Sequence, residues 1–215
     1  MKSAIFAAVL ALLLAPLPAS ADDPLADLEL DPGRTVIDCS NSLVKLPGGL
    51  QVECGTYPST SDPSGVDSGG LPACVNPRFD IRSLAGQPSL YVFARVRGVS
   101  SKACGVWPPQ NAKNNMVTST KKYKPFVHDD ATDWSRKPIE LKHAGLALLF
   151  DSPNKDRDGK CVAFFQPGPP IAGSKETRQY TRYYYIRGWV CTAPGQTLDK
   201  AAAIALVKSF QVEVK

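Results

Sequence analysis

Six cysteines constrain the fold of this 215-residue chain more than any other feature of its sequence. They are Cys39, Cys54, Cys74, Cys104, Cys161 and Cys191. The closest two are 15 residues apart, whereas structural zinc sites usually use cysteine pairs separated by about two to four residues. An even number of cysteines in an exported chain favours disulfides over metal ligands or a catalytic thiol. We therefore expect three disulfides, no bound metal and no cofactor.

The first 21 residues have the three parts of a secretory signal peptide. Lys2 supplies a positive charge, Ala4 to Leu14 form an apolar run, and Ala19-Ser20-Ala21 provides the small residues of a cleavage site. The run is too short for a membrane-spanning helix, which needs about 18 apolar residues. We expect an exported, soluble mature chain in the periplasm or outside the cell, where disulfides persist.

Acidic and basic residues are separated along the sequence. Residues 22–80 contain ten acids and three bases, while residues 81–128 contain eight bases and no acid. A basic surface that includes Lys121, Lys122 and Lys124 suits an anionic partner such as nucleic acid, lipid head groups or a wall polymer. The alternative is that the acidic and basic segments neutralise one another in the folded chain.

The pattern of apolar residues and turn residues predicts one α+β domain. Hydrophobic residues make up 43% of the chain, which is typical of a globular protein. Strands are expected at 35–38, 42–46, 50–54, 90–97, 139–143, 146–150, 161–166 and 178–191. Residues 55–77 and 100–124 show no regular period and are expected to be long connections.

The C-terminal segment predicts a helix that packs on this sheet. An alanine-rich helix is expected from Leu198 to Phe210, with Thr197 as its N-cap and a last strand at 211–215. The stripe at helical spacing that faces the sheet is expected to contain Leu198, Ala201, Ala202, Ile204, Ala205, Val207 and Lys208. The sheet is expected to be mainly antiparallel, with residues 22–80 forming an acidic, loop-rich part and residues 81–215 the sheet and helix of the same domain.

A disulfide is predicted between Cys161, which begins one β-rich segment, and Cys191, which ends another. If they pair as antiparallel strands about a midpoint near residue 176, the two cysteines face each other. Patterns in the sequence leave the pairing of Cys39, Cys54, Cys74 and Cys104 open.

The order of the last elements resembles a known family. A strand, a helix and then Val207-Lys208-Ser209-Phe210 opening a final strand are similar to the closing unit of PsbP/Mog1-like domains. The resemblance covers about 35 residues and implies a sheet topology, with no site. The front half of the chain, with its cysteines, departs from that family.

The histidines offer one candidate for catalysis. His128 is followed by Asp129 and Asp130, which is the acid or base and the orienting carboxylate that a hydrolase needs. No G-x-S-x-G motif accompanies them, and capping or solvation of the acids explains the same residues. A small secreted hydrolase, in particular a nuclease, is therefore the alternative function.

Arginine and aromatic residues alternate in the segment 178–189. On a strand, Arg178, Tyr180, Arg182 and Tyr184 share one face, and the other face carries Tyr183, Tyr185, Arg187 and Trp189. Such a face can stack on bases or sugars while arginine binds phosphate or carboxylate, and we assign binding to the first face. The alternative is a half-buried strand whose arginines lie over its own tyrosines.

The segment Asn154 to Gly159 matches the opening of a calcium-binding loop. Phe165 occupies the twelfth position, where a calcium loop has a bidentate glutamate, so we expect an ordinary turn. The sequence as a whole favours an exported, non-catalytic module that binds an anionic polymer or an envelope protein.

Overall fold

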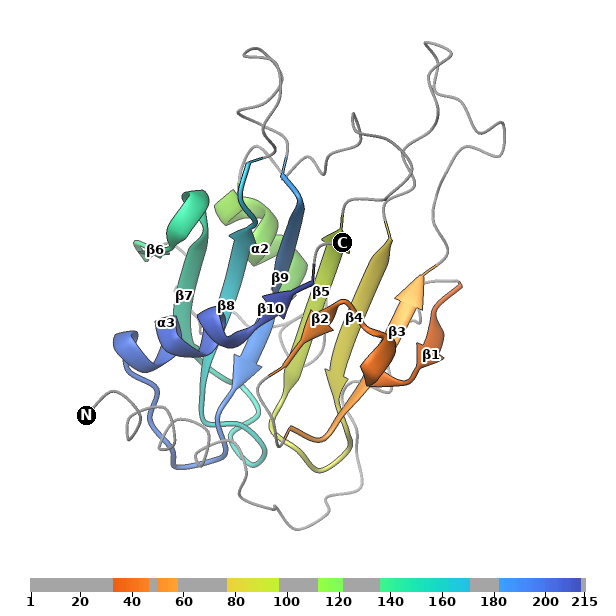
Figure 1. The fold of residues 1–215 in the computed structure, drawn as a ribbon. Helices are drawn as coiled ribbons and strands as arrows, with labels where there is room; N and C mark the ends of the chain where they lie inside the picture. Colours follow the sequence, from red (N-terminus) through yellow and green to blue (C-terminus); the bar gives the residue numbers. More distant parts are fainter. Residues whose placement is uncertain are drawn as a thin grey trace, which may run out of the picture.

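The structure is a computed structural model, and its largest element is one antiparallel sheet of eight strands (Figure 1). The structure describes residues 33–46, 50–57, 77–96, 112–121, 136–170 and 182–213. The strands follow the order β1-β3-β4-β5-β9-β8-β7-β6 across the sheet. Their bounds are β1 Thr35–Ile37, β3 Val52–Tyr57, β4 Arg78–Ser83, β5 Leu90–Val96, β6 Ile139–Glu140, β7 Leu146–Asp151, β8 Lys160–Pro167 and β9 Tyr184–Cys191.

One helix covers each face of this large sheet, and a small second sheet lies on one of these faces. The strands β2 (Val44–Lys45) and β10 (Gln211–Val212) pair with each other and lie with α3 (Lys200–Ser209) on one side, while α2 (Ala112–Lys121) lies on the other (Figure 1). Two short 3-10 helices, Cys39–Asn41 and Lys142–Ala144, complete the described elements. The described part of the chain is therefore an α+β fold. None of the described helices has the length and apolarity needed to cross a membrane.

Alternation along the strands gives the sheet two different cores. The α3 side is mainly aliphatic, with residues such as Ile81, Val92 and Val162 in one core with Leu206 and Val207 of α3. The α2 side is mainly aromatic: its core comprises Tyr57, Tyr91, Phe93, Met116, Leu148, Phe150, Cys161, Ala163, Phe165, Tyr185, Trp189 and Cys191. Burial on both faces explains why β5 and β8 are nearly continuous apolar segments.

The C-terminal helix packs on the sheet as expected, but it begins two residues later. Asp199, not Thr197, is the N-cap of α3, and its carboxylate accepts a hydrogen bond from the backbone N of Ala202 at 2.7 Å. The buried residues of α3 are Ala203, Leu206 and Val207, while Ala202 packs against the same core and Leu198 is buried just before the helix. The expected stripe is therefore right at Leu198, Ala202 and Val207, but it omits Ala203 and Leu206 and includes the exposed Ala201.

Two disulfides lie in the described residues, and none of the cysteines there is free. Cys161 bonds to Cys191, and β8 pairs with β9 so that these residues are opposite each other, which is the register that the sequence predicts. Cys39 bonds to Cys54 and ties the segment after β1 to β3. Cys74 and Cys104 lie outside the described residues.

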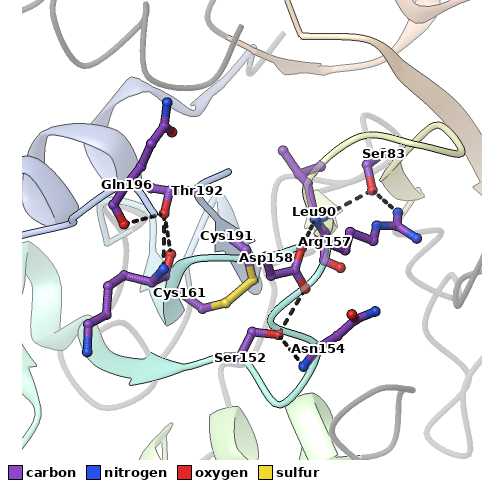
Figure 2. Close-up of a disulfide and its surroundings, with 12 residues drawn as sticks. Ser83, Leu90, Ser152, Asn154, Arg157, Asp158, Cys161, Cys191, Thr192 and Gln196 are labelled. Atoms are coloured by element: carbon purple, nitrogen blue, oxygen red, sulfur yellow. Dashed lines mark hydrogen bonds between the residues drawn. A yellow bond between two sulfur atoms is a disulfide. The ribbon is translucent and has the colours of Figure 1, made fainter. Parts of the chain in front are cut away.

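The buried carboxylate of Asp158 lies beside the Cys161–Cys191 disulfide and connects two turns (Figure 2). Asp158, in the β7–β8 turn, accepts hydrogen bonds from the backbone N of Ser89 at 2.7 Å and from Ser152 Oγ at 2.9 Å. Its neighbour Arg157 donates from Nε to the carbonyl of Gln87 at 2.7 Å. Burial raises the pKa of the Asp158 carboxyl, against the lowering effect of these hydrogen bonds.

This arrangement agrees with an ordinary turn at Asn154 to Gly159. Asp158 is buried and directed at Ser89, whereas Asp156 is exposed. The carboxylate of Asp158 therefore lies in the interior, while that of Asp156 lies at the surface.

Two other expectations are wrong. Residues 112–121 form α2, although the sequence predicts an irregular connection over 100–124. The strand expected over 139–143 ends at Glu140, because His143 and Ala144 adopt φ values of 55° and 62° and turn the chain into β7.

Candidate functional site: an arginine and aromatic face

Arginines from three strands and the segment before β1 gather on the α2 side of the sheet. Arg78, Asp80 and Arg82 alternate along β4, and Tyr91, Phe93 and Arg95 alternate along β5. Tyr185, Arg187 and Trp189 do the same along β9. The register places Asp80 beside Phe93 and Phe93 beside Arg187, so these residues share one face. We call this set the arginine face: Arg34, Arg78, Arg82, Arg95 and Arg187, with Tyr57, Tyr91, Phe93, Tyr185 and Trp189.

Three of these guanidinium groups lie over aromatic rings of neighbouring strands. Arg187 lies over Phe93 at 5.0 Å and Arg78 over Tyr57 at 5.4 Å. Arg82 lies over Tyr91 at 5.8 Å, measured like the others from Cζ to the ring centroid. Contacts of this length are attractive and hold the planar guanidinium in one orientation. The arginine face is thus an ordered arrangement of cations.

At one end of the arginine face, a buried ion cluster forms around Asp80. Arg34 Nε donates to both Asp80 oxygens at 2.8 and 3.1 Å, and Arg82 Nε donates to Oδ2 at 2.7 Å. The hydroxyl of Tyr57 donates to the same oxygen at 3.0 Å. The Asp80 side chain is fully buried, and Arg34 is only 2% exposed. Because burial of an unpaired charge is costly, these partners compensate for the burial of the Asp80 side chain.

The ion cluster depends on the absence of a side chain at residue 55. A Cβ on Gly55 would lie 2.5 Å from Arg34 Nε and in direct collision with Asp80 Oδ1. Glycine at this point of β3 leaves room for the Arg34 guanidinium to reach Asp80 across the sheet. Arg34 also forms an ion pair with Glu53, with 2.7 Å between Nη1 and Oε1.

The cluster also changes the acidity of Tyr57. Burial, followed by the negative charge of Asp80 and the hydrogen bond to it, raises the pKa of the Tyr57 phenol to about 12, against an opposing effect of Arg82. Tyr57 is therefore a neutral hydrogen-bond donor at physiological pH and has no basic character.

At the other end of the arginine face, two arginines are direct neighbours. The register pairs Tyr57 with Arg78, Arg78 with Arg95, and Arg95 with Tyr185, so the four side chains form one row across β3, β4, β5 and β9. Within the described part of the chain, the buried Nε of Arg95 has no hydrogen-bond partner. Arg78 and Arg95 therefore bring two cationic side chains to neighbouring positions of this row.

Most of the residues that the sequence assigns to binding or catalysis lie outside the described part of the chain. The ones outside it are His128, Asp129, Asp130, Lys122, Lys124, Arg178 and Tyr180. Lys121 ends α2, and nothing is described of its side chain. Arg182 forms an isolated bridge with Pro170, and Tyr184 packs against the aliphatic core on the α3 side, where burial raises its phenol pKa. Those assignments remain predictions.

Sequence analysis missed the contributions of β1, β3 and β4 to the arginine face. One signal was present, since Arg78-Phe79-Asp80-Ile81-Arg82 alternates charged and apolar residues as a strand does. Arg82 and Arg95 belong to the acid-free segment 81–128, and Arg187 to the second face of the aromatic segment. In that segment, Arg187 lies over Phe93 of β5 and not over a tyrosine of its own strand.

A metal site has little support among the described residues. Only Asp158, Cys161 and Cys191 there bring three possible ligand atoms together, and both sulfurs are already joined in a disulfide (Figure 2). Comparison of the chain with protein-family models, with curated proteins and with solved structures finds no match.

Proposed function

We propose that this chain is an exported, non-catalytic binding module that holds an anionic ligand on the arginine face. The observation that carries the proposal is the buried Nε of Arg95, which has no acceptor among the described residues. Buried guanidinium donors normally have acceptors. An anion bound beside β5 would satisfy this donor.

The acids of the arginine face do not provide this anion. Among the described residues on this side of β3, β4, β5 and β9, the carboxylates are those of Glu53 and Asp80. Asp80 already accepts from Arg34, Arg82 and Tyr57, and Glu53 pairs with Arg34. Both acids already have cationic partners other than Arg95.

The same contacts support a role without catalysis. A general base needs a group that gains and loses a proton near the working pH. On the arginine face, Tyr57 has its pKa raised to about 12, and Asp80 is fixed between two arginines. Tyr57 is therefore poorly suited to act as a general base, and both oxygens of Asp80 already accept hydrogen bonds from protein groups.

Three finer points belong to this proposal. Cys74 and Cys104 form the third disulfide, since the other four cysteines pair with one another. The C-terminal elements follow a PsbP/Mog1-like topology, and the chain acts in the periplasm or outside the cell. The alternative of a hydrolase that uses His128 with Asp129 or Asp130 concerns residues outside the described part.

Retention on heparin resin over a range of salt concentrations tests the proposed function. We expect Arg95→Gln to elute at lower salt than the wild type, because each lost ionic contact reduces the salt dependence of polyanion binding by about one ion. A variant with Lys121, Lys122 and Lys124 all changed to Gln measures the contribution of the lysine segment. Arg136→Gln, at an exposed arginine before β6, is the charge-matched control. Equal elution of wild type and Arg95→Gln would exclude the arginine face as the binding site.

A further inference from the structure

The part of the arginine face on β3 and β4 is more deeply buried than the helix on the same side of the sheet explains. Asp80 is fully buried, and Arg82 and Tyr57 are 7% and 5% exposed. The described helix on this side, α2, makes its main contacts with β8 and β9. A cover over β3 and β4 is therefore expected from another segment of the chain.

The N-terminal segment reaches the sheet beside this part of the face. β1 pairs antiparallel with β3, and continuing this register by one residue puts Arg34 level with Tyr57 and Arg95. Gly33 has a φ of 97°, which favours glycine, so the chain turns directly before Arg34. Across the sheet, β1 and β5 are three strand spacings apart, which is about 14 Å. The residues before Gly33 are therefore tethered at one end of this short span.

The segment 22–31, which precedes this turn, is strongly acidic. It contains no lysine, arginine or histidine, and its five acids are Asp22, Asp23, Asp27, Glu29 and Asp31. By comparison, the segment 58–76, which also lies outside the described residues, contains two acids. Ten extended residues span up to about 34 Å, so the segment 22–31 is long enough to cross from β1 to β5. Its carboxylates complement the guanidinium groups of the arginine face.

Two buried guanidinium nitrogens of the face can donate to such carboxylates. Nη2 of Arg34 and Nε of Arg95 have no acceptor among the described residues. The Arg34 side chain is only 2% exposed, and its other nitrogens already bind Glu53 and Asp80. Leaving a buried charged donor unpaired costs free energy. Asp31, three residues before Arg34, is the acid nearest to it in the sequence.

We infer that the acidic segment 22–31 lies on the arginine face and competes there with the anionic ligand. Its carboxylates accept from Arg34 and Arg95 and cover the face over β3 and β4. A short tether gives such a segment an effective concentration of about millimolar, so a weakly bound anion is excluded and a polyanion with many charges displaces the segment. The inference rests on the proposed function and specifies how its site is regulated.

Retention of the exported protein on heparin resin tests this competition. The acid-neutralised variant carries Asp27→Asn, Glu29→Gln and Asp31→Asn together. We expect it to elute at higher salt than the wild type, because the arginine face is then open to the polyanion. In the background of Arg95→Gln the same three changes should give a smaller gain, since two changes that act on one site are not additive.

A charge-matched variant controls for the general effect of lost negative charge. It carries Glu140→Gln, Asp156→Asn and Glu213→Gln, which are all exposed and lie outside the arginine face. We expect its elution to shift less than that of the acid-neutralised variant. Equal shifts of the two variants would overturn the inference.

A direct measurement follows the Arg95 side chain itself. In ¹H–¹⁵N spectra, its Nε–H signal is identified by its loss in Arg95→Lys. The signal should shift between the wild type and the acid-neutralised variant, because carboxylate acceptors are lost, while that of the exposed Arg136 stays in place. A free peptide of residues 22–31 at about millimolar concentration should restore the wild-type position. An Arg95 signal at the same position in both proteins would contradict the inference.

The outcomes separate this inference from the proposed function. If the acid-neutralised variant elutes with its control while Arg95→Gln still elutes at lower salt than the wild type, the inference fails and the proposed function stands. If neither Arg95→Gln nor the acid-neutralised variant changes the elution, both fail.

Discussion

At the scale of single residues, Asp158 shows how a buried charge is used for structure in this protein. Its carboxylate bonds the backbone of Ser89 and the hydroxyl of Ser152, and so joins the β4–β5 and β7–β8 turns (Figure 2). Its surroundings raise the carboxyl pKa, mainly by burial. The buried charge of Asp80 is instead compensated by two arginines and a tyrosine that donate hydrogen bonds to it.

The raised pKa of Asp158 predicts a pH dependence of stability with a definite sign. A carboxyl whose pKa is higher in the folded state binds its proton more readily there, so its contribution to stability falls as pH rises through the folded pKa. The free energy of unfolding of the wild type, relative to Asp158→Asn, should therefore be larger near pH 4 than at pH 7. Urea denaturation of both proteins at the two pH values measures the difference. A relative stability that decreases on acidification would contradict the role of burial.

At the scale of elements, the sequence predicts best those segments whose pattern agrees with their burial. The strands β5, β7 and β8 are apolar segments bounded by turn residues, and each lies within two residues of its expected position. The helix α2 escaped prediction because few of its side chains are apolar, and Met116 is its buried anchor. The helix packs on the aromatic core through Met116, and such a tertiary contact leaves no periodic pattern in the local sequence.

The strand β4 was missed for a related reason. Charged residues at Arg78, Asp80 and Arg82 obscure its pattern, although all six of its residues are at least half-buried. The sequence cannot show that these charges neutralise one another through Arg34, whose position depends on the pairing of β1 with β3.

The pair of disulfides allows the stabilisation of two elements to be compared. Cys161–Cys191 closes a loop of 30 residues and Cys39–Cys54 one of 15. On the chain-entropy model, each lowers the entropy of the unfolded chain enough to stabilise the fold by about 3 kcal/mol, and doubling the loop adds about 0.6 kcal/mol. Replacing Cys161 and Cys191 together with Ala should therefore lower the free energy of unfolding more than the same change at Cys39 and Cys54. Chemical denaturation of both variants checks this order, and the reverse order would show that loop length is not decisive.

At the scale of the whole molecule, the candidate site exists only because distant segments meet. The arginine face combines residues from five segments between Arg34 and Trp189, and their neighbours are set by the strand order β1-β3-β4-β5-β9. Alternation within one segment tells which residues share a face, but not which face a helix covers. For this reason the sequence analysis selected the face of Tyr184, which packs on the aliphatic core, and gave less weight to the face of Arg187.

The same topology predicts that the acidic N-terminal part and the remainder unfold together. The boundary at residue 80 falls inside β4, three residue pairs of the β3–β4 pairing cross it, and β2 from the N-terminal part pairs with β10 near the end of the chain. Val44 of β2 is also buried in the core that contains Leu206 and Val207 of α3. Neither part can lose its structure without exposing apolar surface of the other. Scanning calorimetry with the disulfides intact should give one transition, with a ratio of calorimetric to van't Hoff enthalpy of about 1. Two resolved transitions would mean that residues 22–80 form a separate folding unit.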